Sequence, residues 1–283
     1  MVPASVSKKA SNRKAKKSDW NEGKKMIKRD TLINFIYETI GDELLQLAAQ
    51  RDELANGAQI LGGEDVEKVA LGVSLHEDFL KEAIQAGANF CIFHHGLDVR
   101  TYKSRYPTYS QKRLKLIFQN HLTIMGFHFA LDVHPEIGNN AVIIRELGAK
   151  RGEPLFEGYG YTAKFSKPQD AKRLSEKCSK LFEHDIFAVF SGPKKVTTIG
   201  VVSGAAKPYV QHLAEMEAKG VELFISGETS ESVPNKMKEA GINYFACGHY
   251  ATEVFGVQEL GKVIKSHFGD RLEVEFIDIP NPI

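Results

Sequence analysis

The segment KVALGVSLHEDFLKEAIQAGANFCIFHHGLD (residues 68–98) contains a complete strand–helix–strand unit. Residues 68–75 form a short apolar run, which predicts a buried strand. The stretch 76–87 has apolar residues at helical spacing and ends at Gly87, as a helix would. The apolar run 88–93 predicts a second strand. This unit favours an α/β fold, in which a helix connects two neighbouring strands of one sheet.

The same alternation continues through the rest of the chain. We predict helices at 31–51, 76–87, 110–120, 138–148, 167–182, 208–220, 231–241 and 251–268. We predict strands at 68–75, 88–93, 122–129, 159–165, 186–190, 195–204, 222–227, 242–247 and 271–279. The Gly-rich stretch 55–65 is predicted to be a connection. The pattern is typical of a mostly parallel or mixed sheet covered by helices, and 283 residues are enough for two subdomains.

Charge is distributed unevenly along the chain. Residues 1–29 hold ten Lys or Arg and two acids, a formal charge of +8, so the remainder carries −7 of the total +1. This tail has few apolar residues and is predicted to be disordered. A solvated extension is favoured over nucleic-acid contact, because the mildly acidic body offers no matching basic surface. We therefore do not expect nucleic acid as a partner.

Composition also limits where the protein works. No apolar run approaches the ~20 residues of a membrane span, so we expect no membrane association. The three cysteines, Cys91, Cys178 and Cys247, are scattered and form no CxxC motif. This pattern fits reduced thiols packed in a core, and with it a cytoplasmic protein.

Polar clusters follow several of the predicted strands at their carboxyl ends. His94 and His95 follow one strand, while His128 and Asp132 end another. Glu228 and His249 follow two later strands, and Glu253 lies one helical turn beyond His249. Ligands of open α/β sheets bind outside the carboxyl ends of strands. Residues that are distant in sequence can therefore meet there.

Several interpretations of these clusters remain open. A single histidine at a strand end is more often a hydrogen-bonded structural residue, but three clusters together indicate a metal site. Adjacent side chains of a strand point apart, so His94 and His95 converge only if the chain turns, or else each serves a different ion. Along a strand, His128 and Asp132 would lie ~13 Å apart. We therefore expect Asp132 to be a ligand, His128 to lie nearby, and His134 to be a surface turn residue.

The residue types indicate which metals would bind. Imidazole nitrogen and carboxylate oxygen are ligands of borderline divalent cations, here Zn, Mn, Fe, Co or Ni. The loop VVSGAAKP (201–208) leads into a helix and could bind phosphate through its backbone N–H groups. It matches no phosphate-loop motif, so an ordinary strand-to-helix loop is the preferred interpretation.

The chain resembles the Nif-three-like dinuclear-metal hexameric proteins, often labelled GTP cyclohydrolase 1 type 2 homologues. The resemblance covers residues 30–283. The motifs that carry it are NGAQILG (56–62), FCIFHHGL (90–97), HFALDVHPEIGNNA (128–141), GVVSGAA (200–206), LFISGE (223–228), CGHYATEVFGV (247–257) and EVEFIDIPNPI (273–283). One departure is Gly96, where relatives often have Pro, but this removes no ligand.

The resemblance implies a fold, an assembly and a site. It implies two α/β subdomains, approximately 30–130 plus 245–283 and 131–244, without the domain that some members insert. It implies a toroidal homohexamer. It also implies two divalent cations per chain between the subdomains, at the strand carboxyl ends. The implied metal ligands are His94, His95, Asp132 and His249, with Glu253 as the bridge.

From these ligands we expect a metal-dependent hydrolase acting on a nucleotide-like substrate, similar to a GTP cyclohydrolase. Glu228 and His128 are candidates for proton relay, on the basis of their position alone. The alternative is a non-enzymatic protein that stores metal or binds other proteins through its toroid. The ligand set does not separate these two classes, whereas metal-dependent turnover would.

Overall fold

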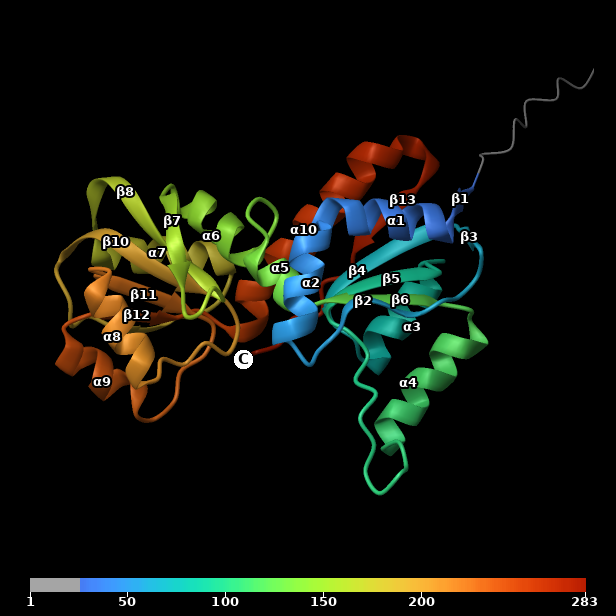
Figure 1. The fold of residues 1–283 in the computed structure, drawn as a ribbon, viewed down its shortest axis with the longest axis horizontal. Coiled ribbons are helices and arrows are strands. Elements are labelled where there is room, and N and C mark those ends of the chain that lie inside the picture. Colours follow the sequence, from blue (N-terminus) through green and yellow to red (C-terminus); the bar gives the residue numbers. More distant parts are fainter. Residues whose placement is uncertain (1–25) are drawn as a thin grey trace, which may run out of the picture.

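The computed structural model of the chain describes residues 26–283, in which two large β-sheets are flanked by helices and a further two strands form a small sheet (Figure 1). The predicted disordered tail lies mostly outside the described residues. Its last residues contradict the prediction, because Ile27–Lys28 form strand β1, which pairs antiparallel with β3 (Asp65–Val66). Helix α1 then begins at Arg29, so the ordered chain starts earlier than expected.

The first sheet has five strands, four of them parallel. Their order is β13 (Glu273–Phe276), β4 (Lys68–Ser74), β5 (Phe90–His95), β6 (Thr123–Phe127) and β2 (Asn56–Ile60). Strand β2 is antiparallel to β6 and forms an edge. This strand lies in the stretch that was predicted to be a connection. The prediction missed it because its glycine and polar residues show no alternation of apolar and polar side chains.

The second sheet has six strands. Their order is β7 (Lys150–Leu155), β8 (Gly160–Asp170), β10 (Lys195–Val202), β11 (Leu223–Ser226), β12 (Asn243–Ala246) and β9 (Phe187–Val189). The central strands β10, β11 and β12 are parallel, whereas β8 and β9 pair with them antiparallel. Both sheets are therefore mixed, and the predicted α/β fold class is confirmed.

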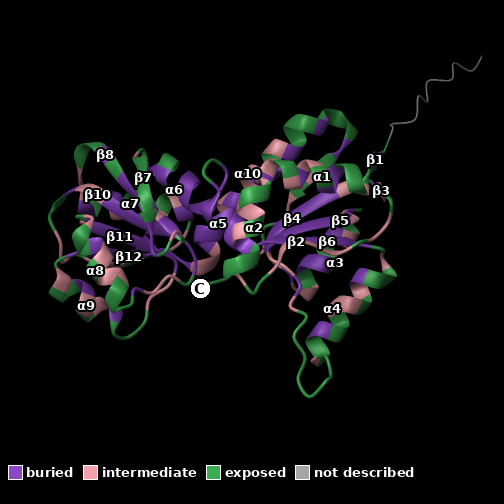
Figure 2. Cartoon of the chain, in the orientation of Figure 1, coloured by how far each residue is buried: buried purple, intermediate pink, exposed green. Residues whose placement is uncertain are grey.

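Helices cover both faces of each sheet (Figure 2). On the first sheet, one face carries α1 (Arg29–Ile40), α2 (Asp42–Arg51) and α10 (His249–Phe268), and the other carries α3 (Glu77–Gln85) and α4 (Thr108–Gln119). On the second sheet, α6 (Asn139–Leu147) and α7 (Ala171–Phe182) lie opposite α8 (Val210–Ala218) and α9 (Val233–Ala240). Each sheet thus has its own pair of apolar cores.

Helix α10 links the two halves of the molecule. It begins directly after β12 of the second sheet, where Ala251 packs in that sheet's core. Its later residues Val257, Leu260 and Ile264 pack in the core of the first sheet. The carboxyl ends of β4, β5 and β6 therefore come close to those of β10, β11 and β12. The predicted subdomain boundaries themselves stay a prediction.

Two further expectations about the fold have clear outcomes. The helix predicted at 31–51 is interrupted at Gly41, whose φ of +89° is a conformation that suits glycine. The predicted core thiols are confirmed, because Cys91, Cys178 and Cys247 are all fully buried. Within the described part of the chain, every helix is too short or too polar to cross a bilayer.

Candidate metal centre

Glu253 lies at the centre of the polar cluster, one turn into α10. Gly248, with a φ of +92°, is the last residue of the connection between β12 and α10, and the helix begins at His249. The four-residue spacing puts His249 and Glu253 on one helix face. The Nε2 atom of His249 consequently lies 3.1 Å from Oε2 of Glu253.

His94 and His95 approach different oxygens of the same carboxylate. Nε2 of His94 lies 3.4 Å from Oε1 of Glu253, and Nε2 of His95 lies 3.2 Å from Oε2. Both histidines belong to β5, where Phe90 and Ile92 face α10 and Cys91 and Phe93 face α3. By this alternation His94 lies on the α10 side and His95 on the α3 side. They meet Glu253 without a turn between them.

Four imidazoles are held in place through Nδ1. His94 Nδ1 donates to the carbonyl oxygen of Phe127 at 3.1 Å, and the Ser74 hydroxyl lies 2.9 Å from His95 Nδ1. His128 Nδ1 donates to Asp52 at 2.8 Å, and His249 Nδ1 donates to Glu228 at 2.6 Å. Because carbonyl and carboxylate oxygens only accept, three of the four Nδ1 atoms carry a proton. Nε2 is then the nitrogen that could bind a metal ion, as in many metal-bound histidines.

Asp132 enters the cluster because the chain turns after β6. Helix α5 (Phe129–Val133) follows immediately, so the amide N–H of Asp132 donates to the carbonyl of His128 at 3.2 Å. The ~13 Å separation expected for a strand therefore does not apply. Oδ1 of Asp132 accepts from Asn139 at 3.0 Å and from the Ser203 hydroxyl at 2.7 Å. It lies 3.7 Å from His94 Nε2.

The cluster has the chemistry of a cation site. Nε2 of His94 and Oε2 of Glu253 are buried and have no hydrogen-bond partner. Unpartnered buried polar atoms are costly unless another group satisfies them. Three overlapping groups have donor atoms within 4.8 Å of one another: His95, His249 and Glu253; His94, Asp132 and Glu253; and His94, His95 and His128. The first two share only Glu253, so these residues fit one cation or two.

The protonation of the cluster reflects its mixture of charges. Burial disfavours the charged form of His94, but the carboxylates of Asp132 and Glu253 outweigh it and raise the pKa to about 9. Burial similarly opposes protonation of His249, yet its contacts with Glu253 and Glu228 raise the pKa to about 9. His95 responds mainly to burial, which lowers its pKa to about 3.

The glutamate itself stays ionised. Burial would raise the pKa of the Glu253 carboxyl, but the charge of His94 and the close approach of the His249 imidazole hold it well below its usual range. A permanently charged carboxylate only 2% exposed therefore lies among imidazoles that can gain or lose protons.

The other candidate residues take varied positions. Glu228 contacts His249 through one oxygen and the ammonium of Lys207 through the other. His128 lies against the rings of His94 and His95, with centroids 4.9 and 5.4 Å away. The expectation for His134 is wrong. It is buried, accepts the amide N–H groups of residues 136 and 137, and lies 3.2 Å from the carbonyl of Thr39.

Sequence reasoning did not identify the residues that hold the ligands in place. Asp52, Ser74, Asn139 and Ser203 contact His128, His95 and Asp132, as described above. They are single polar residues in different elements, with no spacing that connects them to a histidine. Of these residues, Asn139 lies in a quoted motif, in the stretch GNNA of residues 128–141, which could have drawn attention to it.

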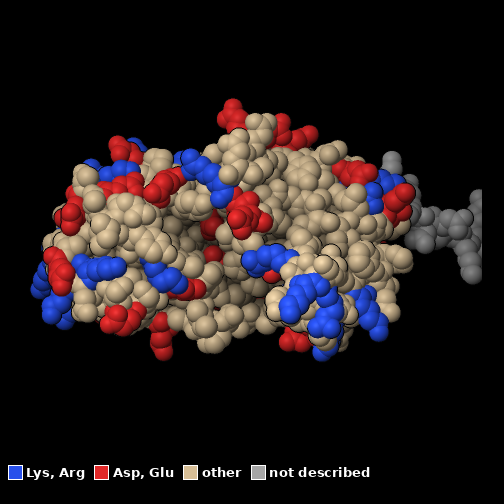
Figure 3. Space-filling model, turned by 60° about the horizontal axis from the view of Figure 1, so that its bottom comes forward, with Lys and Arg blue, Asp and Glu red and all other residues tan. Residues whose placement is uncertain are grey.

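Two cavities adjoin the cluster. A cavity of about 290 Å³ is lined by Asp132, His249 and Glu253, together with His128. A larger cavity of about 1070 Å³ includes His95 and Ser74 in its wall. Figure 3 shows one face of the molecule hollowed between the two halves, with acidic and basic side chains at the edge of the hollow. The polar cluster is therefore accessible to small molecules.

Comparisons with known proteins extend over almost the whole described chain. The family model described as Duf34/NIF3 (NGG1p interacting factor 3) matches residues 31–282. A Haemophilus influenzae protein named GTP cyclohydrolase 1 type 2 homolog is 32% identical over 254 residues, which are 85% of this chain and 98% of that protein.

Solved structures agree with the sequence comparison. The structure titled "Structural genomics, protein ybgI, unknown function" has a TM-score of 0.78 and 30% identity, covering 91% of this chain and 100% of that one. The structure of TTHA1606 from Thermus thermophilus has a TM-score of 0.75 and 27% identity, covering 91% and 100%.

Proposed function

The chain belongs to the Duf34/NIF3 (NGG1p interacting factor 3) family, and from this premise we propose that it is a metal-dependent hydrolase with two divalent cations. The observation that carries the proposal is that the two carboxylate oxygens of Glu253 face different histidines. Its Oε2 faces His95 and His249, whereas its Oε1 faces His94. A shared carboxylate between two groups of three side chains suits two ions. Three protein donors per ion leave coordination positions open, as in catalytic sites.

The chain's own residues divide the work of hydrolysis. When bound, the cations would acidify water and polarise the bond to be cleaved. Asp52 accepts Nδ1–H of His128 and the amide N–H of Phe129 at 3.0 Å. Because its pKa is held well below the usual range, Asp52 stays charged and fixes the His128 ring. Nε2 of His128, facing the cluster, can then accept a proton from the attacking water.

Glu228 has a different role in this proposal. Both of its oxygens are engaged, one by His249 and the other by Lys207. The hydrogen bond to Nδ1 orients the His249 ring and increases its basicity as a ligand. We therefore assign Glu228 to ligand orientation rather than to proton relay.

The proposed substrate is nucleotide-like, with GTP as the first compound to test. The name of the Haemophilus influenzae relative, GTP cyclohydrolase 1 type 2 homolog, motivates that choice. The larger cavity of about 1070 Å³ has room for a nucleotide. The test is hydrolysis of a panel of nucleotides and phosphoesters by protein loaded with Mn, Fe, Zn, Co or Ni.

Variants connect turnover to the cluster. His95→Ala and Asp132→Asn should each lower the rate at least ~100-fold, because each removes a group that positions the reacting water. His121→Asn is the matched control, since His121 is exposed and outside the cluster. If metal-loaded wild type hydrolyses nothing on the panel, or if both cluster variants match the control, the hydrolase proposal is wrong. Metal storage or protein binding would then be the better description.

We also propose that the chain forms a homohexamer in the cytoplasm. The motifs quoted above support this through their resemblance to toroidal proteins. A ring would enclose the metal centres and limit which substrates reach them.

A further inference from the structure

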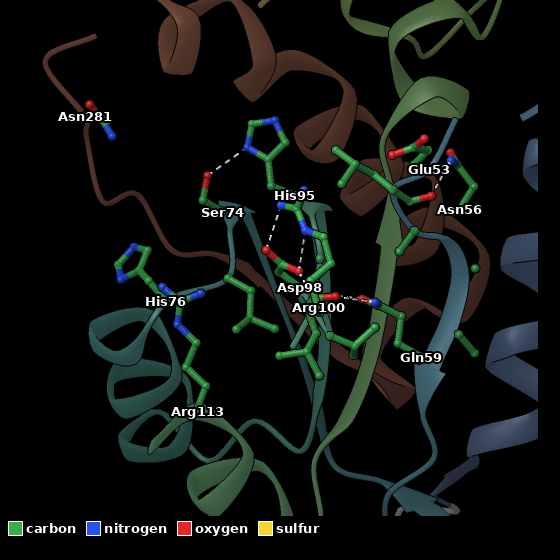
Figure 4. Close-up of a pocket in the computed structure, with 18 of the residues that line it drawn as sticks. Glu53, Asn56, Gln59, Ser74, His76, His95, Asp98, Arg100, Arg113 and Asn281 are labelled. Atoms are coloured by element: carbon green, nitrogen blue, oxygen red, sulfur yellow. Dashed lines mark hydrogen bonds and ion pairs between the residues drawn. The ribbon is translucent and has the colours of Figure 1, made fainter. Parts of the chain in front are cut away.

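The larger cavity extends from Tyr37 of α1 and strand β2 past the strand ends at Ser74 and His95 to α3 and α4 (Figure 4). Its wall includes His95 and Ser74 from the strand ends, His76 before α3, and Arg113 from α4. One part of the wall therefore belongs to the polar cluster, and another part carries side chains that have no role in the cluster. A ligand in this cavity would touch both.

Arg113 is the cation of this cavity that lacks a carboxylate partner. Within residues 26–283, no acid lies within ion-pair distance of its guanidinium. The other arginine, Arg100, is held by both oxygens of Asp98 at 2.9 and 2.8 Å. Arg113 is half-buried, and its guanidinium carbon lies over the Tyr109 ring, 5.0 Å from the ring centroid.

His76 adds a neutral donor beside Arg113 (Figure 4). Its Nδ1 accepts the amide N–H of Phe79 at 3.3 Å and caps α3, so Nε2 carries the proton of the neutral ring. Burial lowers the pKa of His76, and Arg113 adds to this effect, while the charges of Asp78 and Glu82 oppose it. His76 is thus neutral at physiological pH and offers one N–H group.

Charges in the cavity are separated. Arg113 and His76 lie together at one side, while Glu53 lies beside Asn56 at the other side, beyond His95 (Figure 4). Asp98 and Arg100 neutralise each other between these sides. Figure 3 also shows Lys and Arg side chains gathered on the end of the molecule where α4 lies. An anionic group entering the cavity is therefore attracted to the Arg113 side and repelled from Glu53.

We propose that Arg113 and His76 form a subsite for the phosphate of a phosphorylated substrate, which spans the cavity to reach the cluster at His95. Arg113 supplies a planar fork of N–H donors that matches phosphate oxygens, and His76 supplies a further donor. The inference rests on the proposed function for the reaction at the His95 end. The subsite itself is made of side chains and does not depend on metal.

The test is calorimetric titration of the full-length, metal-loaded chain with GMP, guanosine and inorganic pyrophosphate. In wild type, GMP should bind at least ~10-fold more tightly than guanosine, because a charge-assisted hydrogen bond contributes that much. Arg113→Ala should remove this preference, and Arg113→Lys should restore part of it. Arg105→Ala is the matched control, since Arg105 is an exposed arginine near α4 that does not line the cavity. Pyrophosphate should compete with GMP.

The outcomes separate the subsite from the catalytic proposal. The Arg113-dependent preference should persist after the metal is removed with a chelator. If it disappears with the metal, or if Arg113→Ala binds GMP as wild type does, the phosphate is held elsewhere and the inference is wrong. Equal binding of GMP and guanosine by wild type, or failure of pyrophosphate to compete, would also overturn it. Arg113-dependent binding without any turnover would support the subsite and contradict only the hydrolase proposal.

Discussion

At the scale of residues, the central feature of the site is the buried negative charge of one carboxylate and the groups that compensate it. Glu253 is ionised and nearly inaccessible, and an isolated charge in that position would be very costly. Without metal, the protonated rings of His94 and His249 supply the opposite charge. With metal, cations would replace those protons. Metal binding at the proposed site would therefore exchange protons for metal ions.

Glu253→Ala should abolish metal binding at both positions, because both groups of ligands share this residue. Elemental analysis of protein loaded with Mn, Fe or Zn should fall from about two ions per chain to none. Asp132→Asn should lose chiefly the ion on the His94 side. Glu259→Ala, on the same helix but paired with Arg145 and Lys262, should keep full loading. Full loading of Glu253→Ala would show that the glutamate is not a shared ligand.

Metal binding should release protons below pH 9. His94 and His249 have pKa values raised to about 9, so at pH 7 both are protonated in the metal-free protein. Loading the site then releases about two protons, and apparent affinity should rise as pH increases from 7 to 9. Titrations in buffers of different ionisation enthalpy measure this number. His249→Ala should release about one proton fewer, and binding without proton release at pH 7 would contradict the assigned protonation.

The same pKa shifts affect the stability of the metal-free chain. A base whose folded-state pKa lies above its unfolded value stabilises the fold at low pH. The contribution of His94 and His249 is complete below pH 6.5 and is lost as pH rises through about 9. Thermal unfolding of chelated protein should therefore show a falling melting temperature between pH 6.5 and 9. Metal-loaded protein should show a smaller change over that range.

The residues that sequence could identify were those with a recognisable pattern. His94 and His95 are adjacent, and His249 and Glu253 have helical spacing, so together with Asp132 these patterns indicated a metal site, and the family resemblance implied that these residues are its ligands. Asp52 and Ser203 could not be found in this way. Each is close to a ligand only because the chain brings its loop to the strand ends, 76 and 71 residues away from His128 and Asp132.

At the scale of elements, short turns decide which side chains meet. Helix α5 brings Asp132 back toward His94, and the start of α10 at His249 aims two ligands at the same point. Strong apolar strands such as β4 and β5 were predictable, since their burial gives continuous apolar runs. The edge strand β2 and the short α5 were not, because edge position and a single turn leave no periodic signal.

The loop between β10 and α8 also shapes the site. Gly204, with a φ of +64°, approaches α10 so closely that a Cβ there would lie 2.2 Å from Oε1 of Glu253. Gly204→Ala should therefore displace the carboxylate and reduce metal content strongly. Gly220 has nearly the same φ, +63°, but open space around it.

Gly220→Ala is consequently a matched control for backbone strain. It should cost about 1 kcal/mol of stability and leave metal content unchanged. Metal analysis and thermal unfolding of both variants make the comparison. Equal metal content in the two variants would mean that the approach of Gly204 to Glu253 does not matter for the site.

At the scale of the whole molecule, the metal cluster lies where the strand ends of two sheets meet. Helix α10 joins the cores of both sheets, so the relative position of the two halves determines the geometry around Glu253. Alternation of strands and helices was enough to predict an α/β fold with a mixed sheet covered by helices, and the family resemblance implied two such subdomains. The alternation could not predict how they face one another, because that depends on packing between residues far apart in the chain.

The proposed homohexamer is also tested on the whole molecule. Light scattering of the full chain and of a variant lacking residues 1–25 should both give about six times the chain mass. The deletion stops before Ile27 and Lys28, because these residues pair with β3. Metal content should be the same in both proteins, since the candidate ligand groups of the described chain are formed by residues 94–253. A stable monomer at micromolar concentration would contradict the assembly.

The most direct test of the central claim is anomalous diffraction from crystals of the metal-loaded protein, measured at the absorption edge of the metal. The account predicts two peaks per chain, about 3.5–4 Å apart, on either side of Glu253. One should lie beside His95 and His249, and the other beside His94 and Asp132. A single peak enclosed by His94, His95 and His128, or a single peak that does not touch Glu253, would contradict the two-cation centre.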